Sequence, residues 1–520
     1  MEAKERAIRR LYDARARRDW GAVAALLAMR SAARAWRRRS LGRLPRTRIR
    51  CQSVVAEVIR TVGKRGAAWP GIAAIVLVAI AAGSRVPESG WNGEAHFALV
   101  QSLADGTPRI DDHLNQSGDI AYVDGHYYAA KAPGLAMFSL PAYALAKALG
   151  AIPLGSPTSP PAGAHTLDGS TMWFANLVVV VAFLCLLLLI RWAVDRSIGT
   201  AGTPVALMLG LGTLLLPYAT TYFAHDLAAA LGFSAFVLAV YTRPTRPLLA
   251  LVGAGVLAGL AIVVELPAVI VAVAVALYVA FERPHLRRLA SFAAGALVGI
   301  TPLFLFNIWA FGSPVRTSYA HAVKVLGASG HDVLGANDPG VYGLTHPSIG
   351  ALLDLLVSDR GLFVLAPITA LALVGLPGLA RRGLRSEAVF IAGLTAVMLL
   401  YNASYYLPFG GFSAGPRFLI LLLPFLAFPL ADAWLRWRTV TLIVAAVSAF
   451  WMISATLAGP NLPDVDSPNL WLTRIADGNH LTDSILIGGR SGAALFLVPA
   501  LAAILLAAGV VHFAVQRLQR

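Results

Sequence analysis

The densest group of residues that could do chemistry lies between Trp91 and Pro141, in the sequence WNGEAHFALVQSLADGTPRIDDHLNQSGDIAYVDGHYYAAKAPGLAMFSLP. This stretch follows the first apolar segment of a chain in which 57% of the residues are hydrophobic and only 13% are charged. Acids, histidines and a lysine gathered beside apolar segments indicate catalysis or the binding of a charged ligand. The titratable residues concerned are Glu94, His96, Asp105, Asp111, Asp112, His113, Asp119, Asp124, His126 and Lys131.

Three carboxylates of this stretch are candidates for a catalytic acid or base. Glu94 follows the first apolar segment closely and could act as a general base toward an acceptor hydroxyl, with a solvated loop acid as the alternative. Asp111 and Asp112 are adjacent, and paired carboxylates can hold a divalent cation, although adjacent acids also occur in solvated turns. The residues alone therefore assign no cofactor, and a divalent cation at this pair stays open.

Basic and aromatic residues could recognise a phosphate at the membrane surface. The sequence GHYYAAKAPG places Tyr127, Tyr128 and Lys131 just before an apolar run. Lys131 could bind a lipid phosphate as a point charge, or the group could be an aromatic belt with a snorkelling lysine. Arg360 and Arg417 each lie at the end of an apolar run, where the partner is either a bidentate phosphate or a loop acid.

Two further polar groups interrupt apolar runs. The sequence YATTYFAHDLAAA places Tyr222, His225 and Asp226 between two apolar runs, where Asp226 is either a helix cap or a further catalytic acid. Glu265 lies beside Pro267 and is either solvated in a tight turn or directed into a site. The residues expected to bind substrate are His96, Asp119, Tyr127, Tyr128, Lys131, Tyr222, His225, Glu265, Arg360 and Arg417, and no metal ligand is assigned.

The positive charge of the chain is concentrated in its first 66 residues. Residues 1–66 hold 19 Lys and Arg against 5 Asp and Glu, a net of +14 out of +16 for the whole chain. This excess favours a cytoplasmic segment on anionic lipid, and nucleic acid is not expected as a partner because no nucleic-acid-binding fold accompanies the charge. The sequence carries neither a Walker A motif nor a G-x-S-x-G elbow, so ATP-driven work and serine hydrolysis are unsupported.

Hydropathy predicts an all-α, polytopic integral membrane protein with about twelve transmembrane helices. A further apolar run, 133–150, is interpreted as a juxtamembrane helix, because counting it as a span would place most basic linkers outside the cell. The predicted spans are 67–84, 171–190, 201–217, 224–241, 248–264, 266–281, 289–310, 361–379, 387–403, 417–433, 440–458 and 491–514.

The basic linkers also fix the orientation. They place both termini in the cytoplasm of a cell with an inner (plasma) membrane, and the active site is expected on the outer face. The polar segments that should meet there are 85–170, 218–226, the turn at Glu265, 311–360, 404–416 and 459–490.

Four features appear in a characteristic order along the chain. A basic-flanked span precedes a large loop with an acidic motif, and the element D-G-x-Y-Y-x-x-K-x-P-G follows from Asp124 to Gly134. The polar turn at His225 and Asp226 comes next, and the element G-G-x-x-x-G-P-R opens a late span between Gly410 and Arg417. In this order the chain resembles the polyprenyl-phosphate-dependent GT-C glycosyltransferases. The nearest branch is the protein O-mannosyltransferase and aminoarabinose transferase group, often labelled family 39 or RgtA/B/C/D-like.

The resemblance covers roughly residues 67–435, which would form the catalytic core with the outer loop 85–170. Residues 1–66 would precede it as a basic cytoplasmic segment, and 436–520 would follow as C-terminal helices with the outer loop 459–490.

The resemblance implies an inverting sugar transfer from a polyprenyl-phosphate donor on the outer face of a bacterial cell envelope. A first-loop acid would serve as base, basic residues would hold the phosphate, and the acceptor would be a glycan, lipid or protein among the membrane lipids. The family usually carries an Asp-Glu pair where this chain reads Asn92-Gly93-Glu94. Glu94 is therefore the first choice for the base, ahead of Asp111 and Asp112. A transporter, a lipid flippase and a catalytically inactive relative remain as alternatives.

Overall fold

A computed structural model describes residues 69–88, 90–116, 118–149, 169–241, 247–282, 286–323, 343–462, 468–478 and 481–484. The chain divides into two compact units, Met1–Ala73 and Ala74–Arg520, and the second holds the helices and strands apart from the start of the helix Trp69–Gly83. The basic segment 1–66 and the predicted span 491–514 lie outside the described residues, as do parts of the loops 85–170, 311–360 and 459–490.

Long apolar helices form most of the second unit, which indicates an integral membrane protein. Four helices in the described ranges are long and apolar enough to cross a membrane, and a sharply bent pair makes a fifth if it counts as one span. The four are α6 (Gly169–Ser197), α12 (Leu286–Phe311), α18 (Arg385–Ser404) and α20 (Arg438–Ala458). Shorter apolar helices are Trp69–Gly83, α7 (Gly202–Gly212), α9 (His225–Val240), α10 (Pro247–Val264) and α11 (Ala268–Glu282). The predicted count of about twelve spans is not confirmed.

Three predicted spans are broken into short pieces. The run 201–217 becomes α7 and α8 (Leu215–Ala219), separated at Thr213, where the backbone is extended. The run 417–433 begins with two 3-10 turns before a regular helix forms. Those pieces are η3 (Arg417–Leu421), η4 (Leu423–Leu426) and α19 (Ala427–Arg436). Hydropathy does not reveal such breaks, because the sequence stays apolar across them.

The sharpest bend lies within the predicted span 361–379. The helical stretches Ile349–Leu365 and Ile368–Arg381 meet at 98°. Ala366 leaves the helical region at φ −131° and ψ 64°, because the residue before Pro367 is pushed out of that region. The pieces are α14 (Ile349–Val357), α15 (Leu362–Leu365), α16 (Ile368–Val374) and α17 (Leu376–Arg381). The segment 311–360, expected as a polar loop, therefore contains the helix α14.

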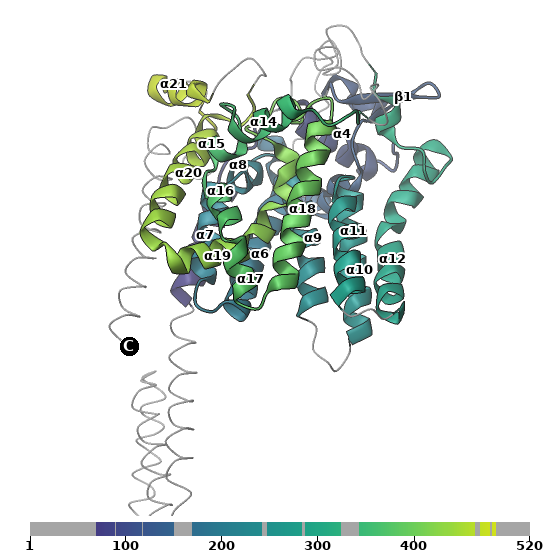
Figure 1. Cartoon of the computed structure of the whole chain (residues 1–520). Helices are drawn as coiled ribbons and strands as arrows, with labels where there is room; N and C mark the ends of the chain where they lie inside the picture. Colours follow the sequence, from purple (N-terminus) through teal and green to yellow (C-terminus); the bar gives the residue numbers. More distant parts are fainter. Residues whose placement is uncertain are drawn as a thin grey trace, which may run out of the picture. The chain divides into compact units, whose positions relative to one another are not determined.

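The large loop after the helix Trp69–Gly83 folds onto one end of the long helices, which we call the loop end (Figure 1). It holds α4 (Trp91–Ala104), η1 (Asp111–Gln116), β1 (Ile120–Val123), β2 (His126–Ala129) and α5 (Gly134–Ala148). The helix α5 lies within the run 133–150, which was expected to form a juxtamembrane helix. The smaller elements η2 (Ser318–His321) and α21 (Asn469–Asp477) complete the described fold, and α17 marks the opposite, far end (Figure 1).

The strands β1 and β2 form an antiparallel hairpin that the all-α prediction did not include. Ile120 pairs with Ala129, and Val123 pairs with His126. The turn residues Asp124 and Gly125 both have positive φ, at 51° and 88°, which is why an Asp-Gly pair suits this two-residue connection.

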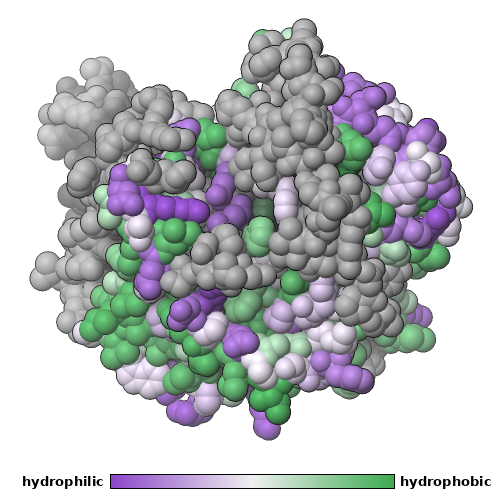
Figure 2. Space-filling model, turned by 90° about the horizontal axis from the view of Figure 1, so that it is seen from above, coloured by the Kyte–Doolittle hydropathy of each residue, from purple (hydrophilic) through white to green (hydrophobic). Residues whose placement is uncertain are grey.

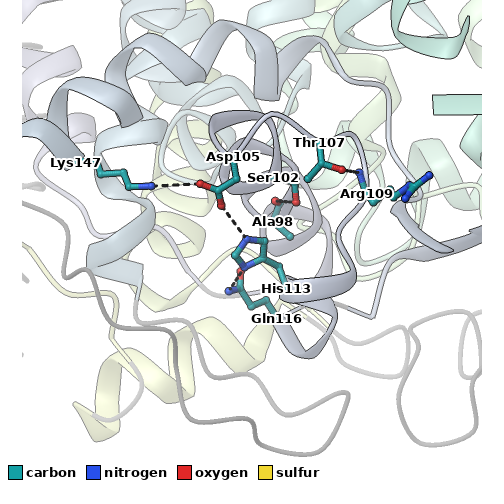
Figure 3. A network of polar contacts seen from close by, with 8 residues as sticks. All are labelled: Ala98, Ser102, Asp105, Thr107, Arg109, His113, Gln116 and Lys147. Carbon is teal, nitrogen blue, oxygen red and sulfur yellow. Dashed lines mark hydrogen bonds and ion pairs between the residues drawn. The ribbon is translucent and has the colours of Figure 1, made fainter. Parts of the chain in front are cut away.

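A polar network joins the pieces of the folded loop (Figure 3). Asp105, at the end of α4, contacts Lys147 Nζ of α5 at 3.4 Å and His113 Nε2 of η1 at 3.9 Å. Gln116 closes the network with a 3.3 Å contact between its Nε2 and His113 Nδ1. These contacts hold α4, η1 and α5 together at the surface of the loop end.

Glycines let α10 and α12 approach closely. A Cβ atom on Gly255 would lie 2.0 Å from the carbonyl oxygen of Phe292, and one on Gly299 would lie 2.2 Å from that of Val256. Small residues at four-residue spacing allow this backbone contact between membrane helices.

Large apolar side chains on the outer sides of these helices are exposed. Phe281 of α11 is 78% exposed, and Val298 and Leu305 of α12 are 63% and 60% exposed. Figure 2 shows hydrophobic side chains in a broad patch along the lower edge of the view, whereas hydrophilic ones gather at the upper right. Apolar exposure on this scale suits contact with lipid.

Candidate functional site

A cavity of about 540 Å³ lies at the loop end. All six polar segments that the positive-inside rule assigns to the outer face contribute to its wall. One residue from each is Gly90, Phe223, Glu265, Tyr319, Tyr405 and Asn461. The expected meeting of these segments is therefore found in the structure, and five of the predicted site residues line the cavity: Asp119, Lys131, His225, Glu265 and Arg417.

The hairpin positions an ion pair in this wall. Asp119 directly precedes β1 and Lys131 follows β2, so antiparallel pairing brings the two residues side by side. The backbone N–H of Ala130 donates to the carbonyl oxygen of Asp119 at 2.9 Å. Lys131 Nζ then lies 2.7 Å from Asp119 Oδ2, with the two side chains only 11% and 16% exposed. The lysine charge is thus already balanced within the protein.

Arg417 is different, because no carboxylate pairs with it in the part of the chain that the structure describes. Its guanidinium lies over the rings of Phe223 and Phe418, at 5.6 Å and 5.5 Å from their centroids. Gly410 has a φ of +87°, and a Cβ there would lie 2.5 Å from Arg417 Nε, so glycine allows the loop to pack against the arginine. A half-buried guanidinium that faces a cavity without a counterion is suited to an anionic ligand.

Glu265 reaches the same cavity from the break between α10 and α11. Its side chain is almost fully buried, and its Oε2 lies 3.7 Å from Nδ1 of His225, the first residue of α9. Burial raises the pKa of Glu265 to about 7, while the charges of Arg417 and Lys131 act in the opposite direction. Near neutral pH this carboxyl group is therefore divided between its two protonation states.

Four predicted residues are buried close to the cavity but do not line it. Glu94 and His96 of α4 are 0% and 2% exposed, and Tyr222 and Asp226 are 1% and 0% exposed. The rings of His96 and Tyr222 meet edge to face at 6.3 Å between centroids. Burial, followed by the charge of Lys131, lowers the pKa of His96 to about 3, so this histidine is neutral at physiological pH.

Asp111 and Asp112 lie in η1, outside the cavity wall. Asp111 Oδ2 is 2.8 Å from His126 Nδ1, and its Oδ1 accepts a 2.7 Å hydrogen bond from the backbone N–H of Tyr127. Asp112 is exposed to solvent. The described ranges contain no group of three or more His, Cys, Asp or Glu side chains that could hold a metal ion.

Tyr128 and Arg360 make contacts within the protein rather than lining the cavity. The Tyr128 hydroxyl donates to the carbonyl oxygen of Ala310 at 3.1 Å. Arg360 donates to the carbonyl oxygens of Gly411 and Ser413, at 3.2 Å and 2.6 Å. Arg360 therefore supports the glycine-rich loop that packs on Arg417.

The aromatic wall is the part of the site that sequence reasoning missed. Tyr401 and Tyr405 stack at 6.2 Å between ring centroids, and Tyr319, Tyr406 and Phe412 also line the cavity. The run YNASYY (401–406), directly before G-G-x-x-x-G-P-R, is the signal that could have indicated it. Aromatic faces suit the apolar faces of sugars and prenyl chains.

Neither a protein-family model nor a curated protein sequence matches this chain. Solved structures do. ArnT from Cupriavidus metallidurans bound to undecaprenyl phosphate matches 86% of this chain and 72% of its own, with 15% identity and a TM-score of 0.52. The same protein in the apo state matches 86% and 76%, with 15% identity and a TM-score of 0.49. The Archaeoglobus fulgidus oligosaccharyltransferase in complex with Zn and sulfate matches 75% and 54%, with 14% identity and a TM-score of 0.41.

The first of these matches spans most of both chains. ArnT is a GT-C glycosyltransferase, so the resemblance predicted from the order of the sequence motifs is confirmed at the level of the fold. The chain therefore shares the GT-C fold of ArnT.

Proposed function

We propose that this protein is a membrane glycosyltransferase that moves a sugar from a polyprenyl-phosphate donor to an acceptor hydroxyl. Arg417 carries the proposal, because this guanidinium faces an aromatic cavity and has no carboxylate partner in the described residues. Phosphate matches the geometry of a guanidinium, and aromatic side chains suit the rest of such a donor. ArnT, which has the same fold, was solved bound to undecaprenyl phosphate.

In this proposal the acceptor hydroxyl displaces the lipid phosphate directly, and different cavity residues bind the phosphate and remove the proton. Arg417 holds the phosphate of the donor and stabilises the charge that grows on it as the sugar departs. Lys131 adds a second positive charge, which Asp119 keeps in place. A carboxylate takes the proton of the acceptor hydroxyl. Glu94, the first choice from the sequence, is buried outside the cavity wall, whereas Asp119 and Glu265 lie within it.

The proposal extends to the position of the site in the membrane. The proposed topology has twelve spans, cytoplasmic termini and an outer-face site. Its grouping of six outer segments on one side is supported by the cavity that they share. The compartment outside a bacterial plasma membrane then supplies the acceptor, which is a glycan, a lipid or a protein.

The test is sugar transfer in membranes that carry the full-length chain. Undecaprenyl-phosphate donors with a panel of radiolabelled sugars are supplied to wild type, Arg417→Ala and Arg109→Ala, an exposed outer-loop arginine outside the cavity (Figure 3). We expect transfer by wild type and Arg109→Ala and its loss in Arg417→Ala. Movement of labelled lipid across proteoliposomes without any transfer would instead favour a flippase.

A further inference from the structure

We infer that Glu265, rather than an acid of the first outer loop, is the general base that takes the proton of the acceptor hydroxyl. This inference rests on the proposed function and assigns the reacting carboxylate within it. It places the base at the break between α10 and α11. The family resemblance would instead place the base in the first outer loop.

The backbone at this break directs Glu265 into the cavity. The N–H of Glu265 still donates to the carbonyl oxygen of Ala261 at 2.9 Å, which ends α10, and its own carbonyl oxygen accepts from the N–H of Ala268 at 2.9 Å, which begins α11. Leu266 and Pro267 form the short connection between the helices and also line the cavity. The carboxylate is thus held by two helix ends, and a rigid support of this kind suits a reacting group.

The other buried acids are less suited to the role. Asp119 lies 2.7 Å from Lys131 Nζ, so its carboxylate is already engaged in an ion pair. Glu94 and Asp226 are 0% exposed and do not line the cavity. Glu265 lines the cavity, and its carboxyl group makes no hydrogen bond to the described residues, because its contact with His225 is 3.7 Å long. Its oxygens are therefore available to an acceptor hydroxyl.

The proposed step is balanced without a further reactant. The acceptor hydroxyl gives its proton to the Glu265 carboxylate while its oxygen bonds to the anomeric carbon of the sugar. The bond between that carbon and the phosphate oxygen breaks, and the lipid phosphate leaves with the bonding electron pair and one additional negative charge. Arg417 faces this leaving group, and the proton on Glu265 then passes to water or to the departing phosphate.

The charge environment of Glu265 suits this task. The groups that act on it come from five different parts of the chain: Lys131 after β2, His225 of α9, Tyr319 of η2, Tyr401 of α18 and Arg417 of η3. Burial prevails over the two cations and brings the pKa of Glu265 to about 7. A general base is most effective when its pKa lies near the working pH.

The experiment compares Glu265→Gln with wild type in the transfer assay, with Asp354→Asn on the exposed face of α14 as the matched control. We expect kcat to fall by about 100- to 10,000-fold in Glu265→Gln, the usual contribution of a general base. Binding of undecaprenyl phosphate should stay near the wild-type value, because Arg417 is intact, and this also shows that the variant is folded. In wild type the rate should rise with pH through a pKa of about 7, and Glu265→Gln should lack that limb.

The results separate this inference from the function on which it rests. Transfer that survives in Glu265→Gln but is lost in Glu94→Gln would return the base to the first loop and leave the glycosyltransferase standing. Loss of undecaprenyl phosphate binding together with transfer in Glu265→Gln would assign the residue to donor binding and overturn the role as base. Absence of transfer by wild type with every donor would remove both proposals.

Discussion

The two ends of the helix bundle treat buried charge in opposite ways. At the far end, Asp432 is 1% exposed and contacts two arginines, with Arg382 Nε at 2.5 Å and Arg436 Nε at 2.7 Å. At the loop end, Arg417 faces a cavity with no carboxylate partner in the described residues, and the carboxyl group of Glu265 there makes no hydrogen bond to them. Asp432 is therefore paired with cations inside the protein, whereas Arg417 is not paired with an anion in the described residues.

The difference indicates what each group of charges is for. A buried carboxylate that already contacts two guanidinium groups gains nothing from a ligand, so the far-end cluster holds α17, α19 and the turn between α17 and α18 together. A buried charge without a counterion destabilises the protein unless a ligand completes it. We therefore propose that Arg417 and Glu265 serve binding and catalysis, so their replacement should affect function more than folding.

The largest effect on stability is expected from removing both partners of Asp432. The double variant Arg382→Ala/Arg436→Ala leaves a fully buried carboxylate without a counterion, which should lower the free energy of unfolding by about 3–5 kcal/mol. Denaturant or thermal unfolding in detergent measures this loss. A variant as stable as wild type would mean that the far-end cluster is not a structural clamp.

The corresponding change at the loop end should affect ligand binding instead. Arg417→Ala removes charge-assisted hydrogen bonding to a phosphate worth about 1.5–3 kcal/mol, so affinity for undecaprenyl phosphate should fall by roughly 10- to 100-fold. Thermal unfolding of the variant without ligand should match wild type. A large drop in stability with unchanged affinity would reverse the comparison between the two ends.

A single added methyl group should disturb the far end by steric overlap. A Cβ on Gly378 would lie 1.7 Å from Asp432 Oδ2, so Gly378→Ala should displace the carboxylate and cost about 1–3 kcal/mol of unfolding free energy. Gly393 of α18 is the matched control, because a Cβ there meets nothing within 4 Å. Equal stability of the two variants would argue against tight packing around Asp432.

The smallest effect is expected at the exposed network of the folded loop. Lys147 and Asp105 form a 3.4 Å pair whose side chains are 40% and 55% exposed. Lys147→Ala should change the free energy of unfolding by less than about 1 kcal/mol, because water and salt screen such pairs. A larger loss would show that this network (Figure 3) supports the cavity wall through α4 and α5.

The sequence best predicts features that depend on the side of the membrane on which a segment lies, or on a short sequence motif. The distribution of basic linkers was enough to predict that six distant polar segments meet, and they do meet around one cavity. The order of four short motifs indicated the GT-C fold that the likeness to ArnT supports. Both inferences use features that act over a few residues or over whole loops, and neither needs knowledge of side-chain packing.

The sequence predicts less well what depends on packing. Hydropathy cannot detect the break before Pro367 or the 3-10 turns after Arg417, so the number of spans is not confirmed. The position of Glu94, soon after the first apolar segment, suggested an accessible loop acid. The folded loop shows instead that Glu94 is buried in α4. The burial of the Glu265 side chain and the aromatic wall around Tyr401 likewise arise from contacts between elements far apart in sequence.

The most direct test of the central claim is a cryo-electron microscopy structure of the full-length chain in lipid nanodiscs with undecaprenyl phosphate. We expect the phosphate in the loop-end cavity, with its oxygens about 3 Å from the Arg417 guanidinium, the length of a charge-assisted hydrogen bond. A phosphate bound instead at the arginines of the far end, or at the surface of the folded loop, would contradict it.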